Sequence, residues 1–424
     1  MTYENVYIQC HVLICCAAVA AAEIMDAGGD LMQEDLEQLK KAFNSSGVEE
    51  CRSLLERKRD EWKSITLDVA VIGNSGVGKS SFINAIRGLT ADDERAAAVG
   101  VTETTMEIRS YEHPRNPLLN FWDLPGVGSD RFPKETYLSK IGVDRFDFFL
   151  LISDDRFTQN DIWLGNELQL RNKKYFFMRT KIGVDVTGNK KRHPKSHNEK
   201  AVMKDIRKSI QQHLKDNGCE NVPVFLIDNY KLKKFDFEQL KLRLVEDFPI
   251  MKKSALVLSL QATSDEMISL KVSELRSRIW KVAALSSVGA MVPLSGVSMP
   301  FDVALVAQEV DVYYTQLGLD ETSLKRYSKI MCSDYRQLQS VVDSRLGCKL
   351  SGVDAVTKLV EMLSKNAVPL TTSAAMEEVS RFIPTIGSVI AASLSVGGTY
   401  YALKLVLDNM ESVALEIVSK VESK

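Results

Sequence analysis

Leu67–Gly73 (LDVAVIG) is a short apolar run rich in β-branched residues, and Gly73-Asn-Ser-Gly-Val-Gly-Lys-Ser80 continues directly from it. The octapeptide fits the phosphate-binding pattern G-x-x-x-x-G-K-[ST], and the helical run SSFINAIRG, residues 80–88, comes next. Glycines let backbone N–H groups curl around phosphate oxygens, and the following helix presents free N–H groups and the positive end of its dipole. The order of strand, loop and helix therefore predicts a nucleotide-binding α/β domain and disfavours a chance glycine turn.

The residues of this loop have separate expected roles. Lys79 adds a mobile cation for the β- and γ-phosphates and is a candidate catalytic residue, while the Ser80 hydroxyl is expected to bind Mg²⁺. We expect the phosphates to contact the whole segment: Gly73, Asn74, Ser75, Gly76, Val77, Gly78, Lys79, Ser80 and Ser81.

A second motif, Asp123-Leu-Pro-Gly126, ends another apolar run. A carboxylate at a strand end can hold Mg²⁺ through water, and the Gly126 N–H can sense the γ-phosphate. D-x-x-G alone is a weak signal, but downstream of a phosphate loop it is a strong one. We therefore assign Asp123 to the metal shell and Gly126 to the nucleotide.

Between these motifs lies Val99–Met106 (VGVTETTM), which is predicted to act as a switch over the γ-phosphate and Mg²⁺. One of Thr102, Thr104 and Thr105 would close the site, and the alternative for each is a hydroxyl at a strand edge. Thr104 and Thr105 are candidate catalytic residues, and Thr105 is also a candidate metal ligand.

The predicted base site is imperfect. Thr180-Lys181 follows an apolar run, where a guanine-binding site is expected to read [NT]-K-x-D, but Gly183 occupies the aspartate position. That carboxylate accepts hydrogen bonds from the guanine ring nitrogens, so its loss weakens the preference for GTP over ATP. Asp185 is a candidate replacement if the loop rearranges, and the Lys181 stem can lie across the base.

The pattern along the chain predicts an α/β P-loop domain with a mostly parallel sheet, combined with an all-α domain from both chain ends. Helical spacing dominates residues 31–65, and strand-like runs alternate with helical stretches over 66–249. From residue 250 to 424 the strand pattern stops, and we expect long helices. The expected strands are Leu67–Gly73, Leu119–Gly126, Phe146–Ser153, Tyr175–Thr180 and Pro223–Asp228.

Composition limits the class of protein. The 424 residues are 45% hydrophobic and 26% charged, with a formal net charge of −2, so we expect no nucleic-acid partner. The seven cysteines form no metal-binding pattern, which favours reduced thiols in the cytosol. Residues 1–30 include the apolar run His11–Ala22, but no basic segment precedes it, so we expect an N-terminal extension without stable structure. A targeting segment is the alternative.

Two apolar segments and one basic stretch remain outside these motifs. Phe382–Leu403 is uncharged and long enough to span a bilayer, but it contains Pro384 and a glycine pair, so a buried helix pair is favoured over a membrane-dipping or spanning segment. Val282–Phe301 is interpreted as two buried helices with a break. Lys190–Lys195 (KKRHPK) is a solvated loop or a contact for anionic lipid.

Together these motifs resemble the immunity-related GTPases, the IRG family, from about residue 35 to the C-terminus. The similar segments are Gly73–Gly88, Gly100–Met106, Phe121–Ser129, Phe132–Leu138, Phe146–Ser153, Arg179–Lys181, Pro223–Phe237 and Gly318–Arg326. Lys79 places the chain with the GKS class of that family. Gly183 departs from its pattern, as does Asp228-Asn229, where the last base-contacting motif usually reads Ser-Asn.

The resemblance implies a Ras-like G domain within a helical platform, binding of GTP and GDP with Mg²⁺, slow hydrolysis and self-association through the G domain. Glu103 corresponds to a switch glutamate implicated in dimerisation and hydrolysis, and Asp228 and Asn229 would contact the base. No glutamine follows the D-x-P-G motif to orient water, so hydrolysis would depend on a partner. The resemblance further implies a cytoplasmic protein that associates peripherally with intracellular membranes in cell-autonomous defence. A nucleotide-gated scaffold with negligible turnover is the alternative, and an ATP-preferring protein is a weaker one.

Overall fold

The computed structural model describes residues 29–100, 107–129, 131–291, 298–331, 333–346 and 396–422. The chain divides into two compact units. The sheet unit comprises Trp62–Met267 and Arg326–Cys332. The helical unit comprises the described residues up to Glu61, Ile268–Lys325 and the described residues from Ser333 onward. The domain boundaries expected near residues 66 and 249 stay predictions.

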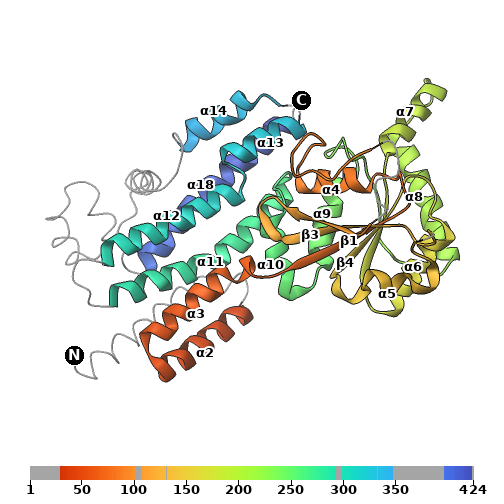
Figure 1. Ribbon diagram of the computed structural model, residues 1–424. Helices are drawn as coiled ribbons and strands as arrows, with labels where there is room; N and C mark the ends of the chain where they lie inside the picture. The colour runs from red at the N-terminus through yellow and green to blue at the C-terminus, as the bar shows by residue number, and fades with distance from the viewer. Residues whose placement is uncertain are drawn as a thin grey trace. The chain divides into compact units, whose positions relative to one another are not determined.

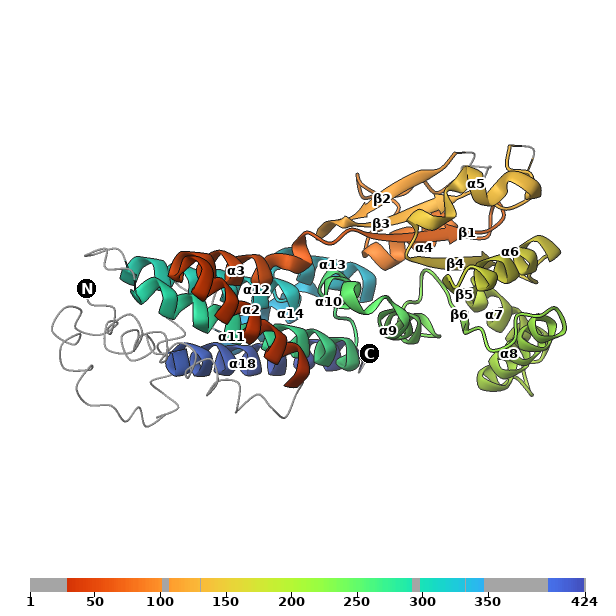
Figure 2. The ribbon, with the colours of Figure 1, turned by 90° about the horizontal axis from the view of Figure 1, so that it is seen from below.

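The sheet unit is built on six strands in the order β2-β3-β1-β4-β5-β6. Its strands are labelled in Figures 1 and 2. β2 runs antiparallel to β3, and every other neighbouring pair is parallel. The expected α/β class with a mixed, mostly parallel sheet is confirmed. The strands are β1 (Leu67–Ile72), β2 (Arg109–His113), β3 (Asn116–Leu124), β4 (Phe148–Ser153), β5 (Lys174–Arg179) and β6 (Val224–Leu226).

The central strands are buried on both faces. Every residue of β4 is buried, and its first five residues, 148–152, form a continuous apolar run with no alternation of polar residues. On one face, Phe149 and Leu151 belong to a core cluster that includes side chains from the helices α5, α6, α7 and α8. On the other face, Phe148 stacks on Phe248, with the ring centroids 6.0 Å apart.

Helices therefore cover both faces of the sheet. α4, α9 and α10 contact the strands on the face of Phe148, where α10 lies against β1 and β3. α6 begins with a capping box in which Thr158 and Asp161 exchange hydrogen bonds, which satisfies amides of its first turn. The helices are α4 (Lys79–Arg87), η2 (Lys134–Thr136), α5 (Tyr137–Ile141), η3 (Val143–Arg145), α6 (Gln159–Leu170), α7 (Ile182–Arg192), α8 (Glu199–Asp216), α9 (Phe237–Asp247) and α10 (Ile250–Ser259).

The helical unit combines segments from both ends of the chain, as expected. α11, α12 and α18 run side by side in Figures 1 and 2, and α14 also contacts α18. Within it, α2 packs on α3. The helices of this unit and its borders are α2 (Gly29–Ser46), α3 (Val48–Asp60), η1 (Glu61–Lys63), α11 (Asp265–Met291), α12 (Ser298–Gln316), α13 (Glu321–Met331), α14 (Tyr335–Leu346) and α18 (Val396–Glu422).

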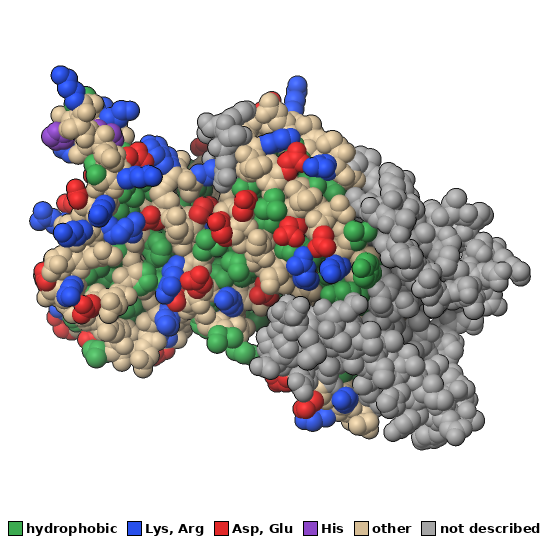
Figure 3. Space-filling model, turned by 180° about the vertical axis from the view of Figure 1, so that it is seen from behind, with side chains coloured by type: hydrophobic (Ala, Val, Ile, Leu, Met, Phe, Trp, Pro, Cys, Tyr) green, Lys and Arg blue, Asp and Glu red, His purple; other side chains and the backbone are tan. Residues whose placement is uncertain are grey.

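Several expectations about single segments can be compared with these bounds. Residues 282–291 belong to α11 and 298–301 to α12, and residues 292–297, where the expected break would fall, lie outside the described residues. Phe382–Leu403 also lies outside them except for the part in α18. Lys190–Lys195 is not wholly a loop, since residues 190–192 form the last turn of α7. These basic side chains are exposed, at the protruding end of α7 seen at the upper left of Figure 3. Among the described helices, none combines the length and the apolar character needed to cross a bilayer.

A buried ion pair joins α11 to α12. Arg278 Nε and Nη2 donate to Glu309 Oε1 and Oε2 at 3.0 and 2.9 Å, and the side chains are only 5% and 3% exposed. Arg278 Nη1 also donates to the carbonyl of Arg59 in α3, at 2.7 Å. One guanidinium therefore connects three helices from distant parts of the sequence.

We expect Glu309→Leu to lower the free energy of unfolding by about 3–5 kcal/mol, because it leaves the buried guanidinium without its carboxylate. Urea denaturation followed by circular dichroism measures this. The control is Glu321→Leu, which removes an exposed pair with Lys325 and should change stability by about 1 kcal/mol or less. Equal effects of the two substitutions would contradict a special role for the buried pair.

Candidate functional site

The phosphate loop connects the end of β1 to the start of α4. Gly78 is the N-cap of α4 and has φ of 94°, a left-handed conformation that L side chains rarely adopt. Gly76 also has a positive φ, of 80°. The loop curls at these two glycines, so the first free amides of α4 face the concave side where an anion binds. Asn74, Ser75 and Gly76 are exposed on this loop, and Val77 is buried beneath it.

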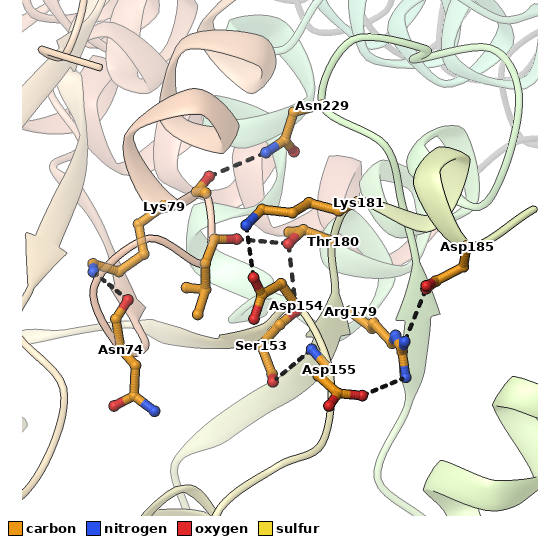
Figure 4. A network of polar contacts seen from close by, with 12 residues as sticks. Asn74, Lys79, Ser153, Asp154, Asp155, Arg179, Thr180, Lys181, Asp185 and Asn229 are labelled. Atoms are coloured by element: carbon orange, nitrogen blue, oxygen red, sulfur yellow. Dashed lines mark hydrogen bonds and ion pairs between the residues drawn. The ribbon is translucent and has the colours of Figure 1, made fainter. Parts of the chain in front are cut away.

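Lys79 is the first residue of α4, and its side chain folds back over the loop. Its Nζ donates to the carbonyl oxygens of Gly73 at 2.9 Å and Asn74 at 3.1 Å, and the residue is 4% exposed (Figure 4). These carbonyls hold the ammonium at the loop without neutralising it. A positive charge is therefore available beside the amides that would receive the phosphates.

Ser80 and Asp123 come together at the base of the loop. Ser80 Oγ donates to Asp123 Oδ2 at 3.1 Å, and both residues are buried. The parallel pairing of β1 and β3 sets Asp123 beside Val71, and this register brings the D-x-P-G motif to the end of β1. A hydroxyl and a carboxylate in contact form an oxygen donor set that suits Mg²⁺.

Gly126 lies against the phosphate loop. A Cβ atom at this position would lie 2.7 Å from Asn74 Oδ1 and 3.2 Å from the Gly73 carbonyl oxygen. A larger residue would therefore push the two motifs apart. The spacing of phosphate loop and D-x-P-G turn depends on glycine at this point.

The predicted switch residues Glu103, Thr104 and Thr105 lie outside the described residues, and their roles stay predictions. The segment leading to them is held by α4. Asn84 Nδ2 donates to the Ala97 carbonyl at 2.9 Å, and the Ala97 N–H donates back to Asn84 Oδ1 at 2.6 Å. Arg87 Nη2 donates to the Arg95 carbonyl at 2.8 Å, and burial lowers the pKa of this arginine to about 10.

The base-side loops are hydrogen-bonded to the phosphate loop. Thr180 Oγ1 donates to the Val77 carbonyl at 2.6 Å, and Asn229 Nδ2 donates to the Gly78 carbonyl at 3.0 Å (Figure 4). Lys181 pairs with Asp154 at 2.6 Å. The structure thus brings two of the predicted base-site segments, Thr180-Lys181 and Asp228-Asn229, to one edge of the sheet.

Asp185 is placed differently from the expectation that it could replace the missing carboxylate. It lies in the first turn of α7 and accepts a hydrogen bond from Arg179 Nη2 at 2.8 Å, toward which it turns in Figure 4. The residue nearest the vacated aspartate position is Asp228. A Cβ atom built on Gly183 would lie 3.3 Å from Asp228 Cγ and well inside van der Waals contact with Asp228 Oδ2.

Two residues of the site escaped the sequence analysis. Asp154 follows β4 and pairs with Lys181, and its position directly after a buried strand was the available signal. Tyr230 is 78% exposed, and its hydroxyl lies 3.3 Å from Ser81 Oγ. No sequence motif indicated that contact, because 149 residues separate the two side chains.

The sheet order, the glycine loop and the Lys79, Ser80 and Asp123 geometry define a P-loop nucleotide-binding domain of the GTPase class. A model of the family described as Interferon-inducible GTPase (IIGP) matches residues 32–413, and the chain belongs to this family. It is therefore a GTP-binding and GTP-hydrolysing enzyme of an immune-related GTPase family, as its resemblance to the immunity-related GTPases implied.

Similar proteins cover most of the chain. Interferon-inducible GTPase 5 of Rattus norvegicus is 33% identical over 387 residues, which span 91% of this chain and 82% of that protein. Interferon-inducible GTPase 1 of Mus musculus is 34% identical over 314 residues, 74% of this chain and 76% of that one. Among solved structures, an oligomerised bacterial dynamin pair covers 92% of this chain and 75% of its own, at 11% identity and a TM-score of 0.34.

We expect Lys79→Ala to weaken GDP and GTP binding on the order of a hundredfold or more. Hydrogen bonds to a charged group contribute about 1.5–3 kcal/mol each, and this ammonium would contact two phosphates. Equilibrium titration with a fluorescent guanine nucleotide measures the loss. Lys191→Ala, which removes an exposed cation from the last turn of α7, should leave affinity unchanged. Unaltered binding by Lys79→Ala would remove Lys79 from the phosphate site.

Proposed function

We propose that this protein binds GTP and hydrolyses it slowly, in a manner that depends on self-assembly through the sheet unit. The observation that carries the proposal is the pre-arranged cradle, in which Lys79 lies on the Gly73 and Asn74 carbonyls and Ser80 contacts Asp123. The loop, Lys79 and Ser80 are arranged as binding of phosphate and Mg²⁺ would require. A group that would orient the attacking water is a separate requirement.

The end of β3 argues for slow hydrolysis by a single copy. Val127 follows the D-x-P-G motif, is 6% exposed and packs into the core cluster shared with α5 and α6. A buried valine can neither donate nor accept a hydrogen bond with water. The missing function would come from the predicted switch residues or from a second copy, which is why we propose turnover that depends on assembly.

The proposed cofactor is Mg²⁺, which P-loop GTPases generally use with GTP. The described residues contain no group of three or more His, Cys, Asp or Glu side chains suited to a metal ion. A site made of Ser80, Asp123 and nucleotide oxygens fits that observation, because the nucleotide supplies the remaining ligands. When bound, the ion would neutralise charge on the phosphates.

We expect Ser80→Ala to raise the Mg²⁺ concentration needed for half-maximal GTP binding by about tenfold, since it removes one of two protein oxygens. Titrating Mg²⁺ against a fixed GTP concentration, with EDTA as the starting point, gives this value. Ser209→Ala, an exposed serine on α8, is the matched control. An identical Mg²⁺ requirement for Ser80→Ala and the parent would contradict the assignment.

We also propose a cellular location and role. We place the protein in the cytoplasm with peripheral association to intracellular membranes, in cell-autonomous immune defence. Membership of an interferon-inducible family supports the defence role. The exposed basic end of α7, Lys190–Arg192, is a candidate contact for anionic headgroups. No nucleic acid is proposed as a partner.

A second candidate function is a nucleotide-gated scaffold with negligible turnover. Gly183 lacks the expected carboxylate, and Asp185 is engaged by Arg179 at 2.8 Å. If neither deficit is compensated, nucleotide would bind without productive turnover. The two functions differ in whether phosphate is released at high protein concentration.

We expect the turnover number to rise severalfold as protein concentration increases from about 1 to 50 μM, because hydrolysis requires a group from the G domain of a second copy. Phosphate release at saturating GTP, with light scattering recorded in parallel, tests this, and Lys79→Ala is the inactive control. Competition of GTP against ATP for the free protein tests selectivity. Flat, near-zero turnover with retained binding would favour the scaffold.

A further inference from the structure

The space beside Gly183 is occupied by another side chain of the same chain. A Cβ atom at this position would overlap Asp228 Oδ2 and would lie 3.1 Å from Lys231 Nζ. Gly183 is in the first turn of α7, and Asp228 follows β6. The Ile182 N–H donates to the Ile227 carbonyl at 3.2 Å, and this bond fixes the next residue of each segment, Gly183 and Asp228, as neighbours.

The Asp228 carboxylate has a defined orientation. Its Oδ1 accepts a hydrogen bond from the Tyr230 N–H at 3.0 Å, and its backbone carbonyl accepts one from the Lys231 N–H at 3.1 Å. Oδ2 is directed to the Gly183 side. The next residue, Asn229, is bonded to the Gly78 carbonyl, so the loop that carries Asp228 is attached to the phosphate loop.

The other nearby carboxylates are engaged elsewhere. Asp185 accepts from Arg179 at 2.8 Å, and Asp154 pairs with Lys181 at 2.6 Å. In the part of the chain that the structure describes, no ion pair holds Asp228, which is 7% exposed.

These observations indicate that the carboxylate expected at position 183 is replaced by the one at position 228. Two carboxylates could not share this space, because the atoms would overlap and like charges in contact repel. We propose that Asp228, from the loop after β6, supplies the guanine-reading carboxylate that Gly183 lacks. Its Oδ2 would accept the N1–H and 2-amino hydrogens of guanine, whereas adenine presents an acceptor at N1. The inference rests on the proposed GTP-binding function.

The test is competition of GDP, XDP, IDP and ADP against a fluorescent guanine nucleotide, for the parent and Asp228→Asn. Xanthine has an oxygen in place of the 2-amino group, so an amide N–H can donate to it where a carboxylate is repelled. We expect the parent to bind GDP much more tightly than XDP or ADP. In Asp228→Asn the ratio of GDP to XDP affinity should fall on the order of a hundredfold, because the amide loses the hydrogen bond from the guanine 2-amino group and gains one to the xanthine oxygen. Asp205→Asn, an exposed aspartate on α8, should leave the ratio unchanged.

A second pair of variants tests the same role of Asp228 even if Asp228→Asn fails to fold. Gly183→Asp alone should lower GDP affinity at least about tenfold, because it forces overlap and like charges. Gly183→Asp with Asp228→Ser should restore the selectivity for GDP over XDP. Circular dichroism melting of each variant verifies that it folds.

The outcomes separate the two proposals. An unchanged ratio in Asp228→Asn, or a change in Asp185→Asn instead, would overturn the role of Asp228 while leaving guanine binding intact. Equal affinity of the parent for GDP and ADP, with Lys79→Ala still abolishing both, would overturn base reading and retain the phosphate site. Failure of the parent to bind any nucleotide would overturn the proposed function as well.

Discussion

Two carbonyl oxygens of the phosphate loop organise the site. Val77 and Gly78 accept hydrogen bonds from Thr180 and Asn229, which belong to the loops after β5 and β6. Their N–H groups and the start of α4 are expected to bind the phosphates, while their carbonyl oxygens accept hydrogen bonds from the segments expected to bind the base. The phosphates and the base of a nucleotide would therefore bind segments that are hydrogen-bonded to each other. These hydrogen bonds set the distance between the phosphate position and the base position.

Much of the sheet unit could be predicted, because burial leaves a clear trace in the sequence. β1, β4 and β5 are covered on both faces, and each contains a continuous run of buried apolar residues, namely 69–72, 148–152 and 175–178. β2 was missed, because its residues Arg-Ser-Tyr-Glu-His are mostly exposed at an edge and carry no apolar pattern. Among the long helices expected after residue 250, residues 321–346 form two helices, α13 and α14, with a break before Tyr335. Apolar periodicity continues across such a break, so spacing alone does not show it.

The candidate site was predictable to a lesser degree. Local motifs identified Lys79, Ser80 and Asp123, since each lies beside a strand end that sequence reveals. The relation of Asp228 to Gly183 was not visible, because it depends on the bond between Ile182 and Ile227 and on how β6 pairs with β5. The sequence shows that the motif residue is missing at 183. Only the three-dimensional structure shows that a side chain from the loop after β6 lies at the same place.

The helical unit uses buried polar groups in a comparable way. Lys271, fully buried, donates to Gln316 Oε1 at 3.1 Å, and Arg278 pairs with Glu309, so α11 and α12 are joined at two levels. Apolar side chains can pack in more than one alignment of two neighbouring helices. A buried polar pair is satisfied in only one alignment, so it specifies how the helices lie along each other.

The overlap between a residue-183 side chain and Asp228 also has an evolutionary consequence. A carboxylate at 183 cannot be accommodated while 228 keeps its own. A single mutation in either direction therefore passes through a protein with two carboxylates or with none at this place. Substitutions at 183 and 228 therefore depend on each other. A return to the common motif needs both changes, whereas other positions of the site can change one at a time.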